Sequence, residues 1–235
     1  MARKVRDRPI EICIDTATRY ASVALSSQGE VTAEFSWRSA QNHSVELVPA
    51  MRLVMEQAGV QMDAIEAVFV VGGPGGFSAL RVGISVAKSL AVGRGIPLVG
   101  VGTLEVEASP YLGLGLPVCA AVAASRSTVY AATFDGGLME APASNLRVAS
   151  HEELASSVEQ PTLFCGEAVE GLADMLKKSL GDAAVITNSP PPTRRPAVVA
   201  QLGYSQMQAI GGEDPAFLQP QYMRSAQINS AKRRK

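Results

Sequence analysis

Residues 66–101 read EAVFVVGGPGGFSALRVGISVAKSLAVGRGIPLVGV in a chain of 235 residues. The stretch EAVFVV, which is apolar after Glu66, predicts a fully buried strand, and the stretch ALRVGISVAKSLAVG is typical of a helix. A second strand starts at Ile96, so the predicted order is strand, helix, strand. Because such a crossover returns the chain in its original direction, we expect the two strands to pair in parallel.

A glycine-rich loop separates the first of these strands from the helix. Glycine permits backbone angles that are closed to other residues, and the proline within the loop stiffens it. The loop lacks the Gly-Lys-Ser/Thr sequence of a phosphate-binding loop, and Lys88 lies well inside the following helix. We therefore interpret it as a structural loop rather than a phosphate cradle. Its residues are Gly72, Gly73, Pro74, Gly75, Gly76 and Phe77.

The sequence before this unit predicts a meander of three strands and a helix. Residues 10–15, 20–26 and 30–37 have strand patterns, and Gln28-Gly29 is a turn signal between the last two. Residues 44–58 have apolar side chains at helical spacing, with Ser44 as the expected cap and Gly59 as the expected end. Leu53 falls outside this apolar stripe and is a candidate exposed residue. With a short helix from Thr103, residues 10–109 give the order β-β-β-α-β-α-β-α.

The second half of the chain partly repeats this order. Strands are predicted at 118–124, 127–134, within 138–149, at 161–165 and at 183–187, and helices at 151–158, 168–180 and 196–210. We interpret SPPPTRRP, residues 189–196, as a rigid surface segment. The fold class is therefore α/β, with two lobes of which the second is a degraded copy of the first. The expected divisions are a basic tail 1–9, a first lobe 10–109, a linker 110–117, a second lobe 118–224 and a basic tail 225–235.

Composition and charge exclude several classes of protein. Apolar residues make up 47% and charged residues 18% of the chain, which argues against global disorder. Residues 1–8 and 232–235 hold four basic groups each, whereas residues 9–231 hold 13 basic and 21 acidic groups and carry a net charge of −8. An acidic body is a poor surface for a polyanion. The longest apolar run, 111–124, is interrupted by glycine and proline and is too short to span a membrane. Without a signal peptide, we expect a cytoplasmic protein.

The motifs of this chain resemble those of a known family. The duplicated order is similar to that of the actin, Hsp70 and sugar-kinase superfamily, and this resemblance implies that both lobes are actin-like (ribonuclease-H-like). Within it, residues 14–25 (IDTATRYASVAL), 42–47 (NHSVEL), 72–84 (GGPGGFSALRVGI) and 99–104 (VGVGTL) resemble the branch that contains the TsaB/YeaZ and TsaD proteins. The ending PQYMR, residues 220–224, is similar to the P-x-Y-L/M-R ending of TsaB.

The resemblance implies a role in tRNA modification. A TsaB/YeaZ chain is expected to be a non-catalytic scaffold of the complex that transfers threonylcarbamoyl to the adenosine beside the tRNA anticodon. Its expected partners are a TsaD-like catalytic subunit, a TsaE-like ATPase, or a second copy when TsaD is absent. Contact with tRNA is expected only through the complex, and no cofactor, metal or membrane is implied.

The resemblance also places a degraded nucleotide site. Asp15 and Thr16 stand where the first phosphate turn of the superfamily lies. The corresponding second turn reads Ala124-Ser125-Arg126, where relatives carry Asp-Ala-Arg, and the adenosine turn reads Cys165-Gly166-Glu167. Asp15 is interpreted as a vestige that caps local backbone donors; a catalytic Asp15 is the alternative.

Histidine and cysteine leave two further hypotheses open. The catalytic paralogue uses two histidines one helical turn apart as metal ligands, whereas His43 has no second histidine near it and His151 is distant. Cys13, Cys119 and Cys165 lie in apolar stretches and are interpreted as buried thiols. A nucleophilic cysteine with a histidine base would instead indicate a peptidase acting on a partner, but no nucleophile elbow is present.

The two helices 44–58 and 78–93 are the expected partner interface. The resemblance implies that they join the matching pair of TsaD in a helical bundle. Small residues spaced four apart on the second helix permit close approach, either of another element in the lobe or of a partner chain. The predicted interface residues are Val48, Met51, Leu53, Met55, Ala79, Leu80, Gly83 and Ala87. The alternative function is a self-sufficient small-molecule kinase or ATPase of the same fold, which nucleotide binding dependent on Asp15 would reveal.

Overall fold

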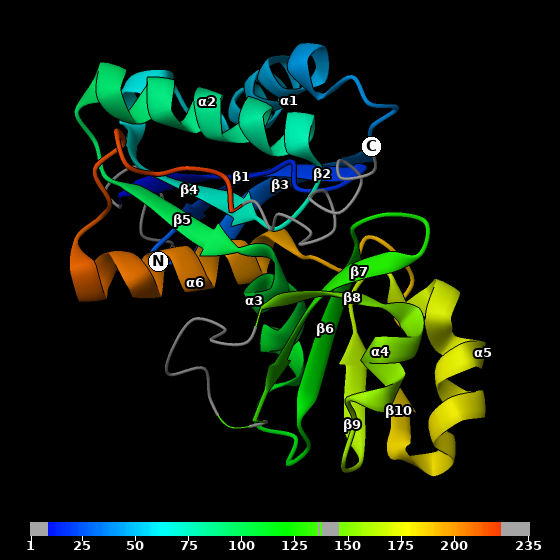
Figure 1. Ribbon diagram of the computed structural model, residues 1–235. Coiled ribbons are helices and arrows are strands. Elements are labelled where there is room, and N and C mark those ends of the chain that lie inside the picture. The colour runs from blue at the N-terminus through cyan, green and yellow to red at the C-terminus, as the bar shows by residue number, and fades with distance from the viewer. Residues whose placement is uncertain (1–8, 136, 138–145, 222–235) are drawn as a thin grey trace, which may run out of the picture.

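The protein folds into two lobes, each built on a mixed sheet of five strands (Figure 1). The computed structural model describes residues 9–135, 137 and 146–221. In the first sheet, the order is β3-β2-β1-β4-β5; the meander pairs antiparallel, and β4 and β5 extend it in parallel from β1. The strands are β1 Ile10–Asp15, β2 Tyr20–Ser27, β3 Glu30–Arg38, β4 Ile65–Gly73 and β5 Leu98–Gly102. The parallel pairing predicted for the strands on either side of the glycine-rich loop is confirmed.

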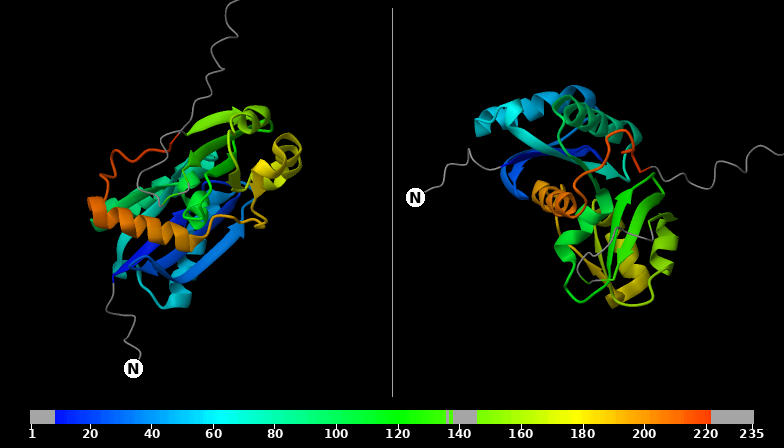
Figure 2. Two further views of the ribbon diagram at one scale, coloured as in Figure 1. Left: turned by 90° about the horizontal axis from the view of Figure 1, so that it is seen from below. Right: turned by 90° about the vertical axis from the view of Figure 1, so that its left-hand side faces the viewer.

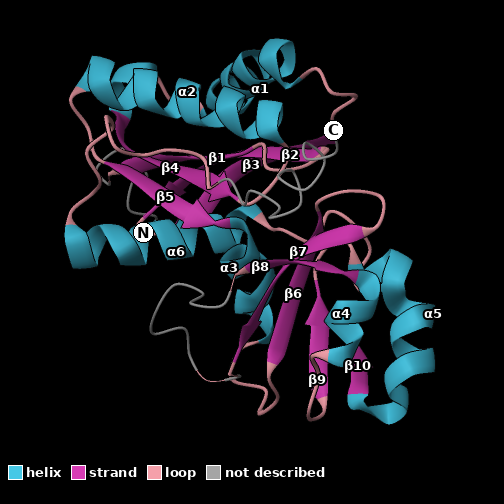
Figure 3. Cartoon of the chain, viewed as in Figure 1, coloured by secondary structure: helices cyan, strands magenta, loops and turns pink. Residues whose placement is uncertain are grey.

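Two long helices cover one face of the first sheet, as the coloured layers in Figure 3 show. They are α1 (His43–Ala58) and α2 (Phe77–Arg94). The predicted cap of α1 is wrong: the helix starts one residue before Ser44, and Asn42 precedes it without a side-chain cap. Gly59 ends α1 as predicted, since its φ of 64° is the left-handed conformation that glycine adopts most easily.

The second lobe repeats the strand order of the first. Its sheet runs β10-β9-β6-β7-β8, with β6, β9 and β10 parallel and β6, β7 and β8 antiparallel. Helices α4 (His151–Ser156) and α5 (Val169–Leu180) pack on one face of this sheet (Figure 1). The duplicated order inferred from sequence is therefore confirmed. The strands are β6 Val118–Ala123, β7 Thr128–Phe134, β8 Arg147–Ser150, β9 Thr162–Cys165 and β10 Ala184–Ile186; single 3₁₀ turns lie at Met62–Ala64, Ser109–Tyr111 and Gly181–Ala183.

Two helices do not follow the predicted lobe boundaries. Helix α6 (Pro196–Ile210) follows the second sheet in sequence but packs on the first, where Val199 and Ala200 join the core. Figure 2 shows α6 lying along the face of the first sheet opposite α1 and α2. Helix α3 (Thr103–Ala108) lies between the sheets, with Val106 in the first core and Leu104 in the second. Helix α6 thus packs in the first lobe although the second lobe was predicted to span 118–224, and α3 contributes to both cores.

The chain after α6 also stays on the first lobe. Glu213 N donates to the Leu98 carbonyl at 2.7 Å, and Gln221 N donates to the Gly72 carbonyl at 2.9 Å. Leu218 is buried in the first core. Residues 1–8 of the predicted N-terminal tail, the whole predicted tail 225–235, part of the 138–149 region and the last three residues of the PQYMR motif lie outside the described residues. Within the described part of the chain, no helix combines the length and apolar character that crossing a membrane requires.

Candidate functional site

The turn after β1, where the resemblance places the first phosphate turn, is bound to the rest of its own lobe. Asp15 Oδ1 accepts a hydrogen bond from Ala17 N at 2.8 Å, the local contact expected of a turn aspartate. The Ala17 carbonyl accepts from Gly76 N at 2.8 Å, and Thr16 Oγ1 donates to the Ala79 carbonyl at 2.7 Å. These contacts fix the turn against the glycine-rich loop and the first turns of α2.

The side chain of Arg194 lies at the junction of the lobes and uses its whole guanidinium group there. Its Nε donates to Asp15 Oδ2 at 2.7 Å, and its Nη1 donates to Glu167 Oε1 at 2.7 Å and Glu107 Oε1 at 3.2 Å. Its Nη2 donates to Thr18 Oγ1 at 2.8 Å and to the Tyr20 carbonyl at 3.2 Å. All five N–H groups of the guanidinium are therefore satisfied. We call Asp15, Glu107, Glu167 and Arg194 the junction cluster.

The junction cluster joins elements that are distant in sequence. Asp15 ends β1 of the first lobe, Glu107 lies in α3, and Glu167 lies in the loop between β9 and α5 of the second lobe. Arg194 comes from the Pro-rich segment just before α6 and is 3% exposed. The prediction that residues 189–196 form a surface segment is thus wrong at Arg194. A buried guanidinium needs several acceptors, and only the combined lobes supply them.

Burial and charge act in opposite directions within this cluster. Burial alone would lower the pKa of Arg194, but Asp15, Glu167 and Glu107 outweigh it and hold that pKa above its usual range. Burial raises the pKa of Glu107 to about 7, although Arg194 and Thr193 act to lower it. One guanidinium faces three carboxylates, so the cluster keeps a net negative charge when all three are ionised.

The substitution Glu107→Gln should change how stability depends on pH. The folded-state pKa of Glu107, about 7, lies above the ordinary 4.5, so its contribution to stability is complete below about pH 4.5 and is lost as the pH rises through about 7. The wild-type chain should lose up to roughly 3 kcal/mol relative to Glu107→Gln over that window. Urea unfolding of both proteins at pH 5 to 8 measures this, and parallel profiles would contradict it.

The small residues of α2 pack inside the first lobe. A Cβ at Gly83 would collide with Thr16 Oγ1, and one at Gly75 would collide with the Ala17 carbonyl. This close approach explains both glycines, because any side chain would push α2 or the loop away from the β1 turn. Gly73, with a φ of 117°, likewise adopts an angle that favours glycine.

Burial removes most of the predicted partner-interface residues from the surface. Val48 and Leu53 are exposed, at 43% and 40%, but the others pack into the core or are half-buried. The prediction is therefore wrong for the residues that α1 and α2 direct at their own sheet. Met51, Met55, Leu80, Gly83 and Ala87 are buried, and Ala79 is half-buried.

Exposed apolar side chains gather instead on the outer side of α1. Val45 is 67% exposed on this helix, where Val48 and Leu53 are exposed too. Phe35 on the adjacent edge strand β3 is 37% exposed and stacks on Trp37 with ring centroids 5.5 Å apart. An apolar groove of about 430 Å³ runs between β3 and α1. Val45 and Leu53 line this groove, whereas Val48 is not among its lining residues. We call Phe35, Val45, Val48 and Leu53 the outer α1 surface.

The remaining candidate nucleophiles and ligands have structural partners. His43 is buried, and its Nε2 lies 2.9 Å from the Thr18 carbonyl, so it supports the β1 turn. Among the described residues, no group of three or more His, Cys, Asp and Glu is arranged to hold a metal ion. Burial raises the pKa of Cys13 to about 12 and that of Cys119 to about 11, and it raises the pKa of Cys165 well above the usual value. Such thiols are poor nucleophiles at neutral pH.

The comparisons with known proteins agree with this architecture. A protein-family model described as TsaD, tRNA N6-adenosine threonylcarbamoyltransferase, matches residues 36–159, which is more than half of the chain. The chain belongs to this family. The matched range starts at the end of β3 and ends after α4, so it includes parts of both lobes.

Individual relatives extend the likeness beyond that range. A Bacillus subtilis protein named tRNA threonylcarbamoyladenosine biosynthesis protein TsaB is 29% identical over 226 residues, covering 93% of this chain and 96% of the relative. The solved structure of YeaZ from Pseudomonas aeruginosa has a TM-score of 0.73 at 24% identity, covering 92% of this chain and all of that one. The resemblance to TsaB/YeaZ proteins is thereby confirmed.

More distant structures share the fold alone. The Lmo2764 protein of Listeria monocytogenes, described as a candidate N-acetylmannosamine kinase, has a TM-score of 0.52 at 10% identity. The match covers 85% of this chain and 99% of that one. The predicted two-lobed fold of the actin and sugar-kinase class is therefore confirmed.

Proposed function

We propose that this chain is a non-catalytic scaffold subunit of the machinery that attaches threonylcarbamoyl to tRNA. The near full-length likeness to a relative named for threonylcarbamoyladenosine biosynthesis supports this role. The family model is described as a transferase, so the absence of catalysis in this chain is the part of the proposal that needs a structural argument.

The junction cluster is the observation that carries that argument. An enzyme of this fold holds the phosphates of its nucleotide, and the metal bound to them, between the two lobes. Here the guanidinium of Arg194 occupies the junction and binds the carboxylates of Asp15, Glu107 and Glu167. These acids are consequently committed to an internal cation, and a metal–triphosphate could bind them only after Arg194 had left. We infer that the junction locks the lobes together instead of holding a nucleotide.

The outer α1 surface supports the second half of the proposal, a docking role. Several large apolar side chains exposed together on one helix are characteristic of a protein–protein interface. We infer that this surface binds a TsaD-like catalytic subunit, and that a second copy of the chain occupies it when that subunit is absent. A TsaE-like ATPase joins the pair, and tRNA contacts this chain only through the complex.

An omission assay tests the proposed function. A TsaD-like transferase, a TsaE-like ATPase, threonylcarbamoyl-adenylate and unmodified tRNA are combined with and without this chain. We expect modification of the tRNA to fall at least 100-fold when the chain is omitted, because the catalytic subunit then lacks its scaffold. Full modification without the chain would overturn the proposal. ATP turnover by the isolated chain, lost in Asp15→Ala, would instead support a self-sufficient kinase or ATPase.

A further inference from the structure

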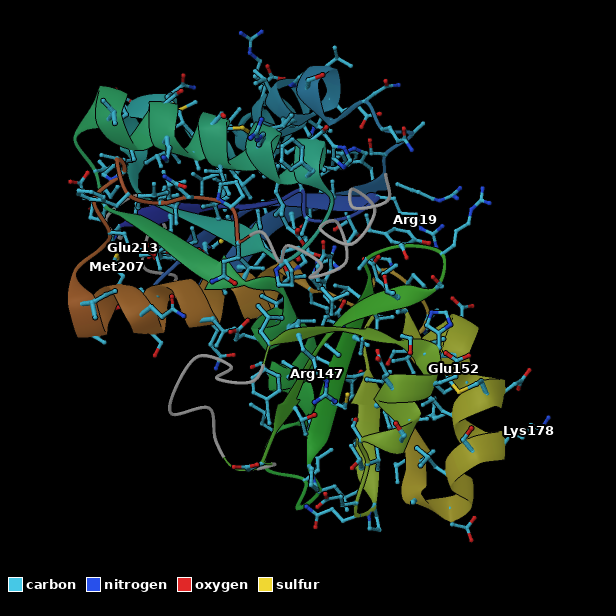
Figure 4. The ribbon with its side chains drawn as sticks, viewed as in Figure 1. Arg19, Arg147, Glu152, Lys178, Met207 and Glu213 are labelled. Atoms are coloured by element: carbon cyan, nitrogen blue, oxygen red, sulfur yellow. The ribbon has the colours of Figure 1, made fainter. Side chains whose placement is uncertain are left out.

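In the part of the chain that the structure describes, the first sheet has one open edge, at β3. The strand order β3-β2-β1-β4-β5 gives β3 a neighbour on one side only. The opposite edge is covered, because Glu213 of the segment after α6 bridges Leu98 of β5, and Figure 4 shows Glu213 beside that strand. The N–H and C=O groups on the outer side of β3 can therefore pair with a strand of another chain.

Residues 33–38 of β3, AEFSWR, form the regular part of this edge. Thr32 has no partner in the register between β2 and β3, which shifts at that point. Such a bulge bends the strand and hinders pairing across it. From Ala33 to Arg38, in contrast, every residue lies opposite one residue of β2. The part of the edge that can accept a second strand is therefore this stretch after the bulge.

The two faces of this stretch differ in chemistry. Phe35 and Trp37 lie on the side of α1, where both line the apolar groove. Because side chains alternate along a strand, Glu34, Ser36 and Arg38 lie on the other face. All three are exposed, and neither Glu34 nor Arg38 forms an ion pair with another described residue. The open edge thus has an apolar face and a charged face.

The sequence of this stretch is complementary to its own reverse. An antiparallel pair of two copies centred on Ser36 places Glu34 of one copy opposite Arg38 of the other. Phe35 then lies opposite Trp37. Opposite charges and aromatic rings that face each other across two strands both stabilise a sheet, and twofold symmetry forms each pair twice. A register centred on Phe35 leaves Glu34 and Arg38 without a charged partner, and one centred on Glu34 places two carboxylates opposite each other.

We propose that two copies of this chain pair through residues 33–38 of β3, in antiparallel register about Ser36. This inference rests on the second-copy part of the proposed function and names the contact that holds the two copies together. The two five-stranded sheets of the first lobes become one continuous sheet across the twofold axis. Both α1 helices lie on the same face of that sheet, so the exposed Val45 and Leu53 beside β3 face the second copy and lose contact with water.

Charge reversals test this register. Glu34→Arg alone places two arginines opposite each other in both pairs of the dimer, and Arg38→Glu alone places two glutamates there. Mixing these two variants restores both ion pairs in a mixed dimer. The matched control is Lys178→Glu, which reverses an exposed charge on the outer side of α5 in the second lobe (Figure 4). Sedimentation of the full-length proteins at about 0.1 M salt measures the dimer Kd, and circular dichroism shows whether each variant is folded.

We expect the wild-type and Lys178→Glu chains to dimerise with equal affinity. Each reversal alone should weaken its own dimer at least about tenfold, because like charges then face each other. The mixture of the two reversals should dimerise about as tightly as the wild type. A wild-type chain that stays monomeric, a dimer that neither reversal weakens, or a mixture that stays monomeric would overturn the proposal. The omission assay reports on the scaffold role whichever way the copies pair, so the two proposals fail separately.

Discussion

Replacing Arg194 with methionine should lower the free energy of unfolding by about 3–5 kcal/mol, the usual cost of stranding buried charges. The guanidinium is the shared partner of Asp15, Glu107 and Glu167, and the arginine and these acids are nearly or fully buried. Methionine fills part of the volume but leaves those carboxylates next to one another in a medium that solvates them poorly. Urea denaturation at neutral pH measures the loss.

Arg195 provides the matched control for that experiment. It is adjacent in sequence and exposed, so Arg195→Met should change stability by less than about 0.5 kcal/mol. Adding Asp15→Asn to Arg194→Met removes one stranded charge and should recover part of the loss. Arg194→Lys keeps the positive charge but has fewer N–H donors than the five of arginine. Its free energy of unfolding should therefore lie between those of Arg194→Met and the wild type. Equal stability of the Arg194→Met and Arg195→Met proteins would contradict the structural role of the junction cluster.

Replacing Val48 with glutamate should weaken binding to a TsaD-like partner by about 30- to 100-fold, the effect of losing an interface hot spot. Val48 is 43% exposed on the outer α1 surface, so the charge is tolerated by the isolated chain and opposes only the burial of this surface by a partner. The same substitution should shift the free chain toward the monomer in sedimentation, if a second copy occupies the surface. Interferometry with the purified partner measures the affinity.

Val185 is the matched control for this substitution. It is a valine on β10 of the second lobe with a similar exposure of 38%, so Val185→Glu introduces the same chemical change far from α1. We expect its affinity for the partner to equal that of the wild type, and circular dichroism should show that both variants are folded. If Val48→Glu and Val185→Glu bind equally well, the outer α1 surface is not the docking site.

The strand and helix order was readable from the sequence because short-range signals set it. The run of five apolar residues before the glycine-rich loop, 67–71, is typical of a buried strand, and the loop permits the turn into α2. Gln28 and Gly29 adopt positive φ angles of 54° and 78°, as the hairpin signal predicts. The three cysteines are buried as their apolar neighbours indicate. Each of these features depends on residues within about ten positions of one another.

The candidate site could be predicted only in part from the sequence, because its contacts join segments that are far apart along the chain. Asp15 was singled out by its motif, but nothing near Glu107 or Arg194 indicates that they meet. Arg194 lies 179 positions from Asp15 and 87 from Glu107 along the chain. The segment 189–196 is rich in proline and has two arginines, a composition typical of a surface linker. The burial of Arg194 depends on contacts with both lobes, so the sequence of the segment does not reveal it. Two acids inside the short, apolar α3, Glu105 and Glu107, were the available signal.

The sequence by itself determined that this chain forms two copies of one strand order, with a tight glycine-rich loop in the first copy. Periodicity and turn chemistry depend on residues that are close together in the sequence, so they can be read without knowing the tertiary contacts. The tertiary structure alone decided which sheet α6 covers, which side of α2 is buried, and which cation the junction acids receive. An apolar stripe specifies that a helix face must be buried but not against what, and a charge finds its partner only in the assembled fold.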